Sequence, residues 1–405
     1  MKAPVRSADI LIPKTGFEYW SVVACDQFTS DLEYWKEVER TVNGHPSAYR
    51  IMLPEIYLEG NDVEKRIDSI NSTMNEYLSG GVFAEYKNAM IYVERTQPDG
   101  KIRQGIVAAV DLEEYDYSKN SKSLIRATEG TVLERIPPRV RIRKDAPLEM
   151  PHVMLLIDDK ALSVIEKTGE NKQDFRKLYD FDLMSGGGHI KGYLIPDEVC
   201  ENVITALENL SDKTGNGLLF AVGDGNHSLA TAKECYERLK TRIGKEAAAN
   251  HPSRYALAEI VNIHSPALEF EPIYRVLFNC DPRKVVDELK ETFDKGNTVI
   301  KCFYDGKSEE IGVKIPDGMI TVGALQSFID ALIKKDASIK VDYIHGEEEV
   351  ERLSSEQGRL GFVFEGIGKD TLFASVSATG ALPRKTFSMG TAYDKRYYLE
   401  CRKIK

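Results

Sequence analysis

The sequence predicts an α/β protein with mixed sheets, because short apolar runs alternate along the chain with segments of helical periodicity. Three observations support this class. The chain has 405 residues, which is enough for about two or three domains. Hydrophobic residues make up 42% of it and charged residues 29%, as is usual in globular proteins. The runs at 153–157 and 218–222 are apolar throughout, which is typical of buried strands.

The N-terminal part of the chain predicts a helix and a hairpin. Residues 63–78 have helical spacing and are followed by two glycines that end the helix. Strands at 89–95 and 102–110 flank a turn that contains proline, aspartate and glycine, which is a hairpin signal. A further buried strand is expected at 20–24, directly before Cys25.

One segment contains alternating arginines. Arg139, Arg141 and Arg143 are separated by single apolar residues, so a strand here would place three guanidinium groups on one face. Guanidinium groups bind phosphate or carboxylate in a bidentate manner, and Arg126 and Glu129 lie just upstream. The alternative is a solvated strand face that pairs with carboxylates nearby in the sequence, namely Glu134, Asp145 and Glu149.

Two further stretches carry candidate ligands. Asp158 and Asp159 follow the apolar run 153–157, and two carboxylates there are suited to hold Mg²⁺ with its waters and substrate phosphates. The alternative is that they cap the start of a helix. His189 follows three glycines that form a lid or an anion-binding nest, or else a plain hairpin turn.

The most informative stretch is residues 218–243, which predicts a strand, a glycine-rich loop and an amphipathic helix. The loop consists of Gly223, Asp224, Gly225, Asn226, His227 and Ser228. A helix N-terminus presents unpaired N–H groups and about half a positive charge, so it attracts anions. Asp224 and His227 add an acid and a base, and Asn226 or Ser228 can cap the helix. The alternative is a structural turn with a solvated histidine.

The C-terminal part predicts a second α/β region. We place the division between residues 1–265 and 266–405, because two prolines in 266–274 interrupt the regular pattern. Helices and strands alternate beyond this point, which indicates an additional C-terminal α/β lobe. Its last stretch is basic and aromatic, and Lys385 is a candidate phosphate ligand there.

Composition argues against several functional classes. The formal net charge of −10 argues against general nucleic-acid binding. No apolar stretch approaches the roughly 20 residues of a membrane span, and the N-terminus lacks the apolar core of a signal peptide. The six cysteines form no CxxC pair, so zinc and disulfide frameworks are not expected and a cytoplasmic location fits. Walker, nucleophile-elbow, zinc-protease and protein-kinase motifs are absent.

Five motifs together resemble the bacterial domain-of-unknown-function 1015 family over nearly the whole chain. They are VACDQFTSDLEYW, LIRATEGTVLERIPPRVRIRKDAPLEMPH, GDGNHSLATAK, VDYIHG and LPRKTFSMG. The resemblance implies a ParB/sulfiredoxin-like core, a superfamily in which free-serine kinases and nucleotide-binding partition proteins handle phosphates at a similar loop. The usual loop of the family is Asp-Gly-His-His-Arg. Asp224, Gly225 and His227 match it, whereas Asn226 replaces a histidine and Ser228 replaces the arginine, which removes a phosphate clamp.

The resemblance and the loop predict a serine-kinase-like phosphotransferase that uses a nucleotide (ATP or ADP) and Mg²⁺ on a small hydroxyl-bearing metabolite. Asp224 or Glu129 would orient or deprotonate the hydroxyl group, and His227 would contact a phosphate oxygen or act as acid and base. This mechanism requires residues 126–143, 158–159 and 224–228 to lie together.

The main alternative is a non-catalytic nucleotide-binding regulatory or ParB-like module that uses the same loop. DNA binding and a sulfiredoxin-like redox activity at Cys25 are weaker alternatives. Whether the protein forms a homodimer is left open by the sequence.

Overall fold

The computed structural model of the chain describes residues 2–29, 31–58, 60–118, 120–131, 136–214, 217–317 and 319–405. It confirms the mixed α/β class. The chain divides into two compact units, each described by itself below. Unit 1 comprises Met1–Leu268 together with Gly390–Lys405, and unit 2 comprises Glu269–Met389.

These units differ from the predicted division at the C-terminus, because residues 390–405 belong to unit 1 rather than to the C-terminal lobe. The returning segment is held by backbone pairing. β20 (Arg402–Lys403) pairs with β8 (Leu148–Glu149), and Tyr398 forms an isolated bridge with Val22. These partners are far apart in the sequence, so the periodicity of the segment does not predict the return.

A ten-stranded sheet forms the centre of the described part of unit 1, in the order β10-β11-β4-β5-β13-β9-β12-β7-β6 with β1 beside β5. β12 runs parallel to β7 and antiparallel to β9, and β9 runs parallel to β13. A separate ribbon pairs β2 with β3. The strands are β1 (Val5–Arg6), β2 (Ala8–Pro13), β3 (Phe83–Ala89), β4 (Ile91–Thr96), β5 (Ile102–Asp111), β6 (Tyr115–Asp116), β7 (Ile125–Ala127), β9 (Met154–Ile157), β10 (Arg176–Asp182), β11 (His189–Leu194), β12 (Phe220–Asp224) and β13 (Tyr255–Asn262).

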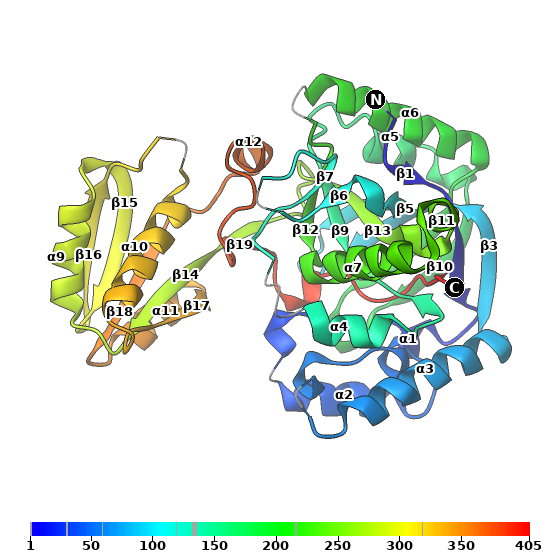
Figure 1. Cartoon of the computed structure of the whole chain (residues 1–405), viewed down its shortest axis with the longest axis horizontal. Helices are drawn as coiled ribbons and strands as arrows, with labels where there is room; N and C mark the ends of the chain where they lie inside the picture. The colour runs from blue at the N-terminus through cyan, green and yellow to red at the C-terminus, as the bar shows by residue number, and fades with distance from the viewer. Residues whose placement is uncertain are drawn as a thin grey trace. The chain divides into compact units, whose positions relative to one another are not determined.

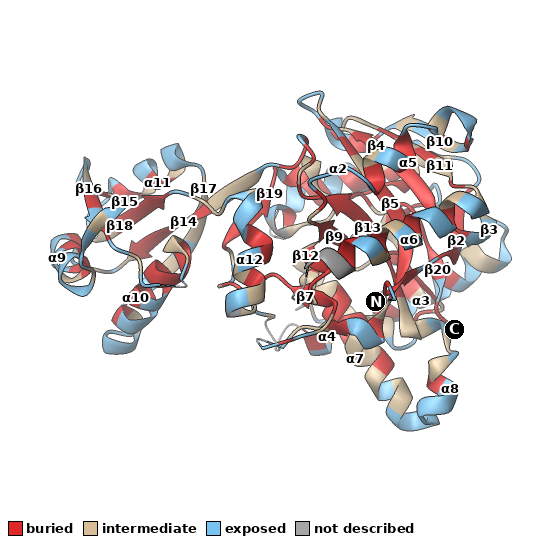
Figure 2. Ribbon diagram, turned by 90° about the horizontal axis from the view of Figure 1, so that it is seen from above, coloured by how far each residue is buried: buried red, intermediate tan, exposed pale blue. Residues whose placement is uncertain are grey.

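Helices cover both faces of this sheet (Figure 1). They are α1 (Phe17–Trp20), α2 (Leu32–Val42), α3 (Val63–Ser79), α4 (Ile136–Arg143), α5 (Ile165–Gly169), α6 (Asp197–Thr214), α7 (Asn226–Ile243) and α8 (Lys245–Ala249). Successive side chains of β4 alternate between the faces: Ile91 and Val93 pack in the core that contains α2 and α3, whereas Tyr92 packs in the core that contains α6 and α7. The central strands are therefore buried on both sides, as Figure 2 shows.

Several predicted elements are confirmed, and one apolar run is not a strand. The predicted helix at 63–78 is α3, and the predicted hairpin is β4 and β5. The strand expected at 20–24 is wrong, because Trp20 ends α1 and only Val22 forms a bridge. Trp20, Val22 and Val23 are nonetheless fully buried. This apolar run therefore indicates a buried segment but not a strand.

The longest helices in the described residues, α6 and α7, have 18 residues each and carry charged side chains along their length. No helix in this part of the chain is long and apolar enough to cross a membrane.

Unit 2 contains a second sheet, with the order β16-β15-β18-β14-β17 and β19 beside β14. One face packs with α9 and α10, and the other packs with α11. The strands are β14 (Phe270–Phe278), β15 (Lys295–Tyr304), β16 (Lys307–Val313), β17 (Lys340–His345), β18 (Arg359–Phe364) and β19 (Phe387–Met389). The helices are α9 (Pro282–Thr292), α10 (Thr321–Lys335), α11 (Glu347–Ser354) and α12 (Lys369–Thr379).

Candidate functional site

The glycine-rich loop joins β12 to α7. β12 continues through Gly223 to Asp224, and α7 begins at Asn226 with Gly225 as the N-cap residue. Gly225 has φ 82°, a left-handed conformation that favours glycine, and a β-carbon there would lie 3.0 Å from Cα of Val153. Its amide donates a hydrogen bond to Asp224 Oδ1 over 2.8 Å. The loop therefore requires glycine at position 225 both for its conformation and for its close approach to Val153.

The N-terminus of α7 is open in the described structure. No side chain caps the helix at Gly225, and the two predicted caps, Asn226 and Ser228, lie inside the first turn. That turn contains no acidic residue. Oδ1 of Asn226 is buried and has no hydrogen-bond partner among the described atoms. Because an α-helix leaves its first N–H groups without intrahelical partners, this end attracts anions.

Glu129 and Asp224 lie at the same edge of the sheet, at the ends of neighbouring strands. β7 and β12 are parallel neighbours in which Ala127 lies opposite Val222, and each carboxylate follows its paired residue by two positions. Thr128 Oγ1 donates a hydrogen bond to the Val222 carbonyl over 2.6 Å and ties the two strand ends together. The structure thus places Glu129 and Asp224 at neighbouring strand ends.

Two residues of the returning C-terminal segment reach this edge, and the sequence analysis missed both. Lys395 Nζ lies 3.9 Å from Asp224 Oδ2. The Tyr398 hydroxyl lies 2.6 Å from Nδ1 of His152. Burial, and then the charge of Asp224, raises the pKa of Tyr398 above its ordinary value. The basic and aromatic composition of the tail was the only signal of this return.

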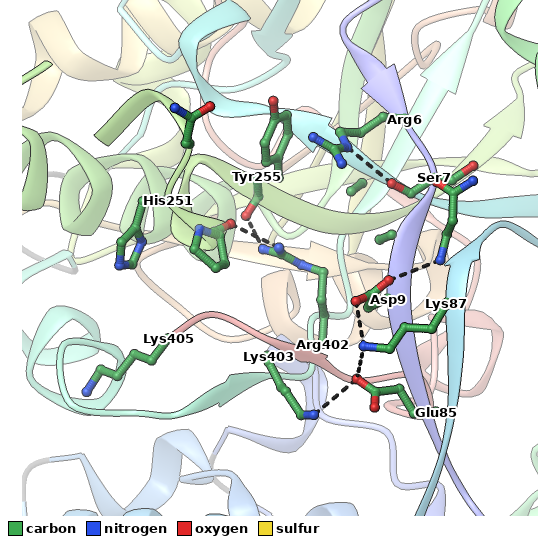
Figure 3. Close-up of a pocket in the computed structure, with 15 residues that line it drawn as sticks. Arg6, Ser7, Asp9, Glu85, Lys87, His251, Tyr255, Arg402, Lys403 and Lys405 are labelled. Atoms are coloured by element: carbon green, nitrogen blue, oxygen red, sulfur yellow. Dashed lines mark hydrogen bonds and ion pairs between the residues drawn. The ribbon is translucent and has the colours of Figure 1, made fainter. Parts of the chain in front are cut away.

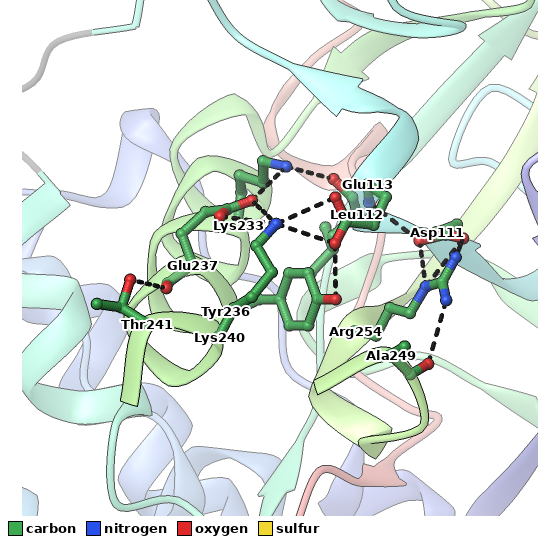
Figure 4. A network of polar contacts seen from close by, with 10 residues as sticks. All are labelled: Asp111, Leu112, Glu113, Lys233, Tyr236, Glu237, Lys240, Thr241, Ala249 and Arg254. Atoms are coloured by element: carbon green, nitrogen blue, oxygen red, sulfur yellow. Dashed lines mark hydrogen bonds and ion pairs between the residues drawn. The ribbon is translucent and has the colours of Figure 1, made fainter. Parts of the chain in front are cut away.

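Helix α7 is anchored along its length to the turn that follows β5 (Figure 4). Lys233 Nζ donates to the Leu112 carbonyl over 2.9 Å. The Tyr236 hydroxyl donates to Glu113 Oε1 over 2.8 Å, and Lys240 Nζ donates to the same oxygen over 2.9 Å. These contacts fix the helix against the sheet, so its N-terminus is held in place rather than positioned by the loop alone.

The predicted arginine strand is wrong, because Ile136–Arg143 forms helix α4. Pro137 and Pro138 lie in its first turn, where an N–H group needs no intrahelical partner. On a helix, Arg139 and Arg143 share a face while Arg141 points elsewhere, so the three guanidinium groups do not form one surface. An alternation of only five residues was too short to distinguish a strand from a helix.

Each of these arginines contacts a glutamate. The pairs are Arg139 with Glu55 at 2.8 Å, Arg141 with Glu64 at 2.7 Å, and Arg143 with Glu149. The predicted partner Glu149 is thus found, Asp145 contacts Lys144 instead, and Glu134 lies outside the described residues. The charge of Arg139 acts on Tyr398, so Arg139 lies within electrostatic reach of the candidate site.

Arg126 points away from the loop. It is buried in β7, and its Nε donates to the Ser123 carbonyl over 2.8 Å. Its guanidinium group lies beside Gly217, which precedes β12. Burial lowers the pKa of Arg126. The side chain therefore extends toward the start of the two parallel strands, whereas the loop follows their end.

Asp158 and Asp159 have separate protein partners. Asp158 Oδ1 lies 2.6 Å from His264 Nε2. Asp159 is buried and accepts hydrogen bonds from the amides of Ser163 and Val164, at 2.6 and 2.9 Å. No group of three or more histidine, cysteine, aspartate or glutamate side chains in the described residues is arranged to hold a metal ion.

These two aspartates also lie at the other end of the strands from the loop. β9 is antiparallel to β12, with Met154 opposite Asp224, so the carboxyl end of β9 lies beside the start of β12. The structure therefore separates Asp158 and Asp159 from Asp224, contrary to the adjacency that the predicted mechanism requires. A magnesium site at this pair stays a prediction.

His189 lies in the antiparallel hairpin of β10 and β11. Its ring nitrogens lie 2.6 Å from Asp182 Oδ1 and 2.6 Å from Asp180 Oδ1. The contact with Asp182 is the largest cause that raises the pKa of His189. The preceding glycines make a tight turn, in which a β-carbon at Gly188 would lie 2.2 Å from the Thr96 carbonyl oxygen. This geometry accounts for the glycines as a hairpin turn.

Lys385 belongs to unit 2. Its backbone has φ 58°, and its carbonyl accepts a hydrogen bond from Arg275 Nη1 over 3.0 Å. Its role as a phosphate ligand stays a prediction.

Cys25 lies in a buried environment. Burial raises the pKa of its thiol to about 11, against smaller opposing effects of the Gln27 amide and Lys395. A thiol that stays protonated at neutral pH is a poor nucleophile. This environment gives no support to the sulfiredoxin-like alternative.

Three solved structures resemble this chain at low similarity. A mutant free serine kinase in complex with ADP has a TM-score of 0.41 and 11% identity, and the match covers 75% of this chain and 93% of that one. A conserved hypothetical protein from Pyrococcus furiosus has a TM-score of 0.37 and 11% identity, with 72% and 93% covered. C-terminally truncated SbnI from Staphylococcus aureus has a TM-score of 0.38 and 8% identity, with 70% and 82% covered.

A search of curated proteins gives no match. The ParB/sulfiredoxin-like core stays a prediction. The model of the family described as "Protein of unknown function (DUF1015)" matches residues 7–401, so the chain belongs to this family, as its five motifs predicted.

Proposed function

We propose that this protein is a nucleotide-dependent phosphotransferase and that the loop at 223–228 holds the phosphates of the nucleotide. The observation that supports this proposal most is the open N-terminus of α7. Gly225 lies in a left-handed conformation, no described side chain caps the helix, and the first turn carries no acid. Backbone N–H groups at such an end bind phosphate oxygens through charge-assisted hydrogen bonds.

Asn226 supports a second ligand group at the same place. Its buried Oδ1 has no partner among the described atoms. Leaving a buried acceptor unsatisfied costs about 1–3 kcal/mol, so this oxygen favours a ligand that brings a donor. A phosphate ester has no such donor at neutral pH, whereas a hydroxyl or ammonium group has one. The acceptor substrate is therefore proposed to be a small metabolite with a hydroxyl group.

The carboxylates at the sheet edge are suited to move the proton of that hydroxyl group. In the proposed step the hydroxyl oxygen forms a bond to the terminal phosphorus, the bond from phosphorus to the leaving nucleotide oxygen breaks, and the hydroxyl proton passes to Asp224. Glu129 follows the neighbouring strand and orients the substrate. His227 donates a hydrogen bond to a phosphate oxygen. Positioning and charge neutralisation of this kind supply most of the catalysis in phosphoryl transfer.

Lys395 takes the role of the arginine that Ser228 replaces in the usual loop of the family. Its ammonium group lies 3.9 Å from Asp224 Oδ2, so a positive charge is held beside the proposed base. As phosphate charge develops during transfer, this ammonium group would stabilise it. Arg139 adds a second positive charge within reach of Tyr398.

Neither Asp158 nor Asp159 takes part in the proposed step. Asp158 and Asp159 are separated from the loop and are occupied by His264 and by the amides of Ser163 and Val164. Mg²⁺ that accompanies a nucleotide is commonly held by the phosphates and one or two carboxylates, so nucleotide binding is tested with and without it.

The alternative is a regulatory module that binds a nucleotide without turnover. The replacement of the usual arginine by Ser228 is the observation that favours it, because the loop itself then carries no guanidinium group. The two proposals share the phosphate site and differ in whether Asp224 acts as a base.

A thermal-shift screen with ATP and ADP, with and without Mg²⁺, tests the phosphate site. A ligand present at about 100 times its Kd stabilises the folded state by about 2.7 kcal/mol, which raises Tm by several degrees. We expect this rise for the wild type, its loss in His227→Ala, and its retention in His45→Ala, which alters an exposed histidine outside the site. No rise with either nucleotide, or an undiminished rise in His227→Ala, would refute the proposal.

Asp224→Asn separates the enzyme from the regulatory module. If the protein is a phosphotransferase, the wild type converts the nucleotide in the presence of hydroxyl-bearing metabolites, and Asp224→Asn binds the nucleotide but loses turnover by about 100-fold or more. Tight binding by the wild type with no product from a broad panel of hydroxyl acceptors would favour the regulatory module.

A further inference from the structure

Unit 1 contains a pocket of about 370 Å³ that shares no residue with the candidate site (Figure 3). Its lining comes from four separate parts of the chain, at 6–9, 85–88, 250–255 and 402–405, together with Ala109. The volume lies within the range of pockets that hold small metabolites. Nothing in the proposed phosphotransferase mechanism uses it.

The lining is positively charged on a protein of net charge −10. Five lysine and arginine side chains face two carboxylates. Both carboxylates contact lysines: Lys87 Nζ lies 2.8 Å from Asp9 Oδ2 and 2.9 Å from Glu85 Oε1, and Lys403 Nζ lies 3.0 Å from Glu85 Oε1. The negative charge of the lining is thus already neutralised from within the pocket.

Arg402 is also committed to the protein. It is buried, its Nε donates to Glu149 Oε1 over 2.9 Å, and its Nη1 donates to the Pro252 carbonyl over 2.9 Å. These contacts join the returning C-terminal segment to the sheet. Arg402 therefore forms part of the wall and is not free to bind a ligand.

Arg6 and Lys405 differ from the other cations, because neither has an ion-pair partner among the described residues. Arg6 is held in place from two sides. Its Nε donates to the Ser7 carbonyl over 3.2 Å, and its guanidinium carbon lies 4.6 Å from the centre of the Tyr255 ring. Its terminal nitrogens keep their hydrogen-bonding capacity. An arginine fixed in this way binds an anion with little loss of side-chain entropy.

His251 adds a neutral donor to the lining. Its Nδ1 accepts a hydrogen bond from the Ser253 amide over 3.2 Å and lies 2.7 Å from Ser253 Oγ. Burial, and then the charge of Arg242, lowers the pKa of His251, which favours the neutral imidazole. A neutral ring that accepts at Nδ1 carries its proton at Nε2. That N–H group is a donor whose partner is not supplied by the described residues.

We propose that this pocket binds a small phosphate monoester, with Arg6 and Lys405 as the charged ligands of the phosphate and His251 Nε2–H as a neutral donor. A phosphate monoester carries nearly two negative charges at pH 7, which matches the two cations without partners. The proposal is independent of the loop at 223–228.

Calorimetric titration with inorganic phosphate and with glycerol 3-phosphate at low ionic strength tests this assignment. We expect saturable binding, weakened about tenfold or more in Arg6→Glu. Lys65→Glu makes the same kind of charge change on the exposed face of α3 and should alter the affinity less than about twofold. Binding should also persist in His227→Ala, which distinguishes this pocket from the loop site.

Further variants distinguish a specific phosphate site from general attraction of anions to positive charge. Lys405→Ala and His251→Ala are expected to weaken binding about threefold to tenfold each, without changing the far-ultraviolet circular dichroism. Arg6→Gln replaces Arg6→Glu if the latter does not fold. Equal losses in Arg6→Glu and Lys65→Glu, no saturable heat at concentrations on the order of 10 mM, or complete loss in His227→Ala would overturn the proposal.

Discussion

The N-termini of α7 and α9 both leave backbone N–H groups without intrahelical partners, but only the α9 end has a described side chain that accepts hydrogen bonds from them. At α9, the Asp281 side chain accepts hydrogen bonds from the amides of Arg283 and Lys284, over 3.2 and 3.3 Å, and Pro282 occupies the first turn. At α7, the N-cap residue is Gly225, and no described side chain completes the end. A cap is worth about 1 kcal/mol, so one helix is completed by its own sequence while the other leaves its amides available to a ligand.

The largest expected effect is the loss of the conformation that keeps the α7 end open. Gly225→Ala should lower the free energy of unfolding by about 2–3 kcal/mol, because a side chain in the left-handed region costs about 1–2 kcal/mol and the new β-carbon would meet Val153 at 3.0 Å. Urea unfolding measures this loss. The control is Gly44→Ala, where φ is 80° and nothing lies within 4 Å, so the loss should be smaller. Equal losses would mean that the contact with Val153 contributes nothing.

The next effect concerns the capped helix. Asp281→Ala should destabilise unit 2 by about 1 kcal/mol, because the amides of Arg283 and Lys284 lose their acceptor. Both tryptophans, Trp20 and Trp35, belong to unit 1, so tryptophan fluorescence reports on that unit while circular dichroism reports on both. We expect Asp281→Ala to shift the unfolding transition seen by circular dichroism and to leave the transition seen by tryptophan fluorescence unchanged. The response to nucleotide should stay at the wild-type level, and a weakened response would contradict the separation of the two helix ends.

The smallest expected effect is that of Ser228→Asp, which should raise the free energy of unfolding and lower the nucleotide affinity. Ser228→Asp places a carboxylate in the first turn of α7, where the helix dipole favours it by about 0.3–1 kcal/mol. The same charge repels phosphate, so nucleotide affinity should fall about tenfold while the free energy of unfolding rises. Ser228→Asn is the neutral control and should change neither quantity much. A rise in both stability and affinity would argue against an anion at this end.

The sequence predicted the loop well because its evidence is local. The apolar residues before Gly223 and the regular spacing after Ser228 lie within one strand and one helix, and the structure has both elements. The same reasoning failed at Arg139, because five alternating residues fit an exposed strand and a helix almost equally. It failed at Val22 and Val23 because burial in a core does not require a sheet.

Other parts of the site could not be placed from local periodicity. Lys395 reaches Asp224, and Tyr398 reaches His152, only because the C-terminal segment returns to unit 1. The direction of β9 relative to β12 decides that Asp158 lies away from the loop, and direction follows from topology rather than from periodicity. Contacts between residues so far apart in the chain depend on the whole fold.

The returning segment also determines when the candidate site can be completed during protein synthesis. A ribosome that adds about 5–20 residues per second needs on the order of 10 s to make unit 2 after it has made residue 268. Throughout that interval, Arg402 is not yet available to the Glu149 carboxylate, which is buried in the finished protein, and Lys395 is not yet beside Asp224. Unit 2 is continuous in sequence, whereas unit 1 is complete only once residues 390–405 have been made. The site is therefore among the last parts of the molecule to form.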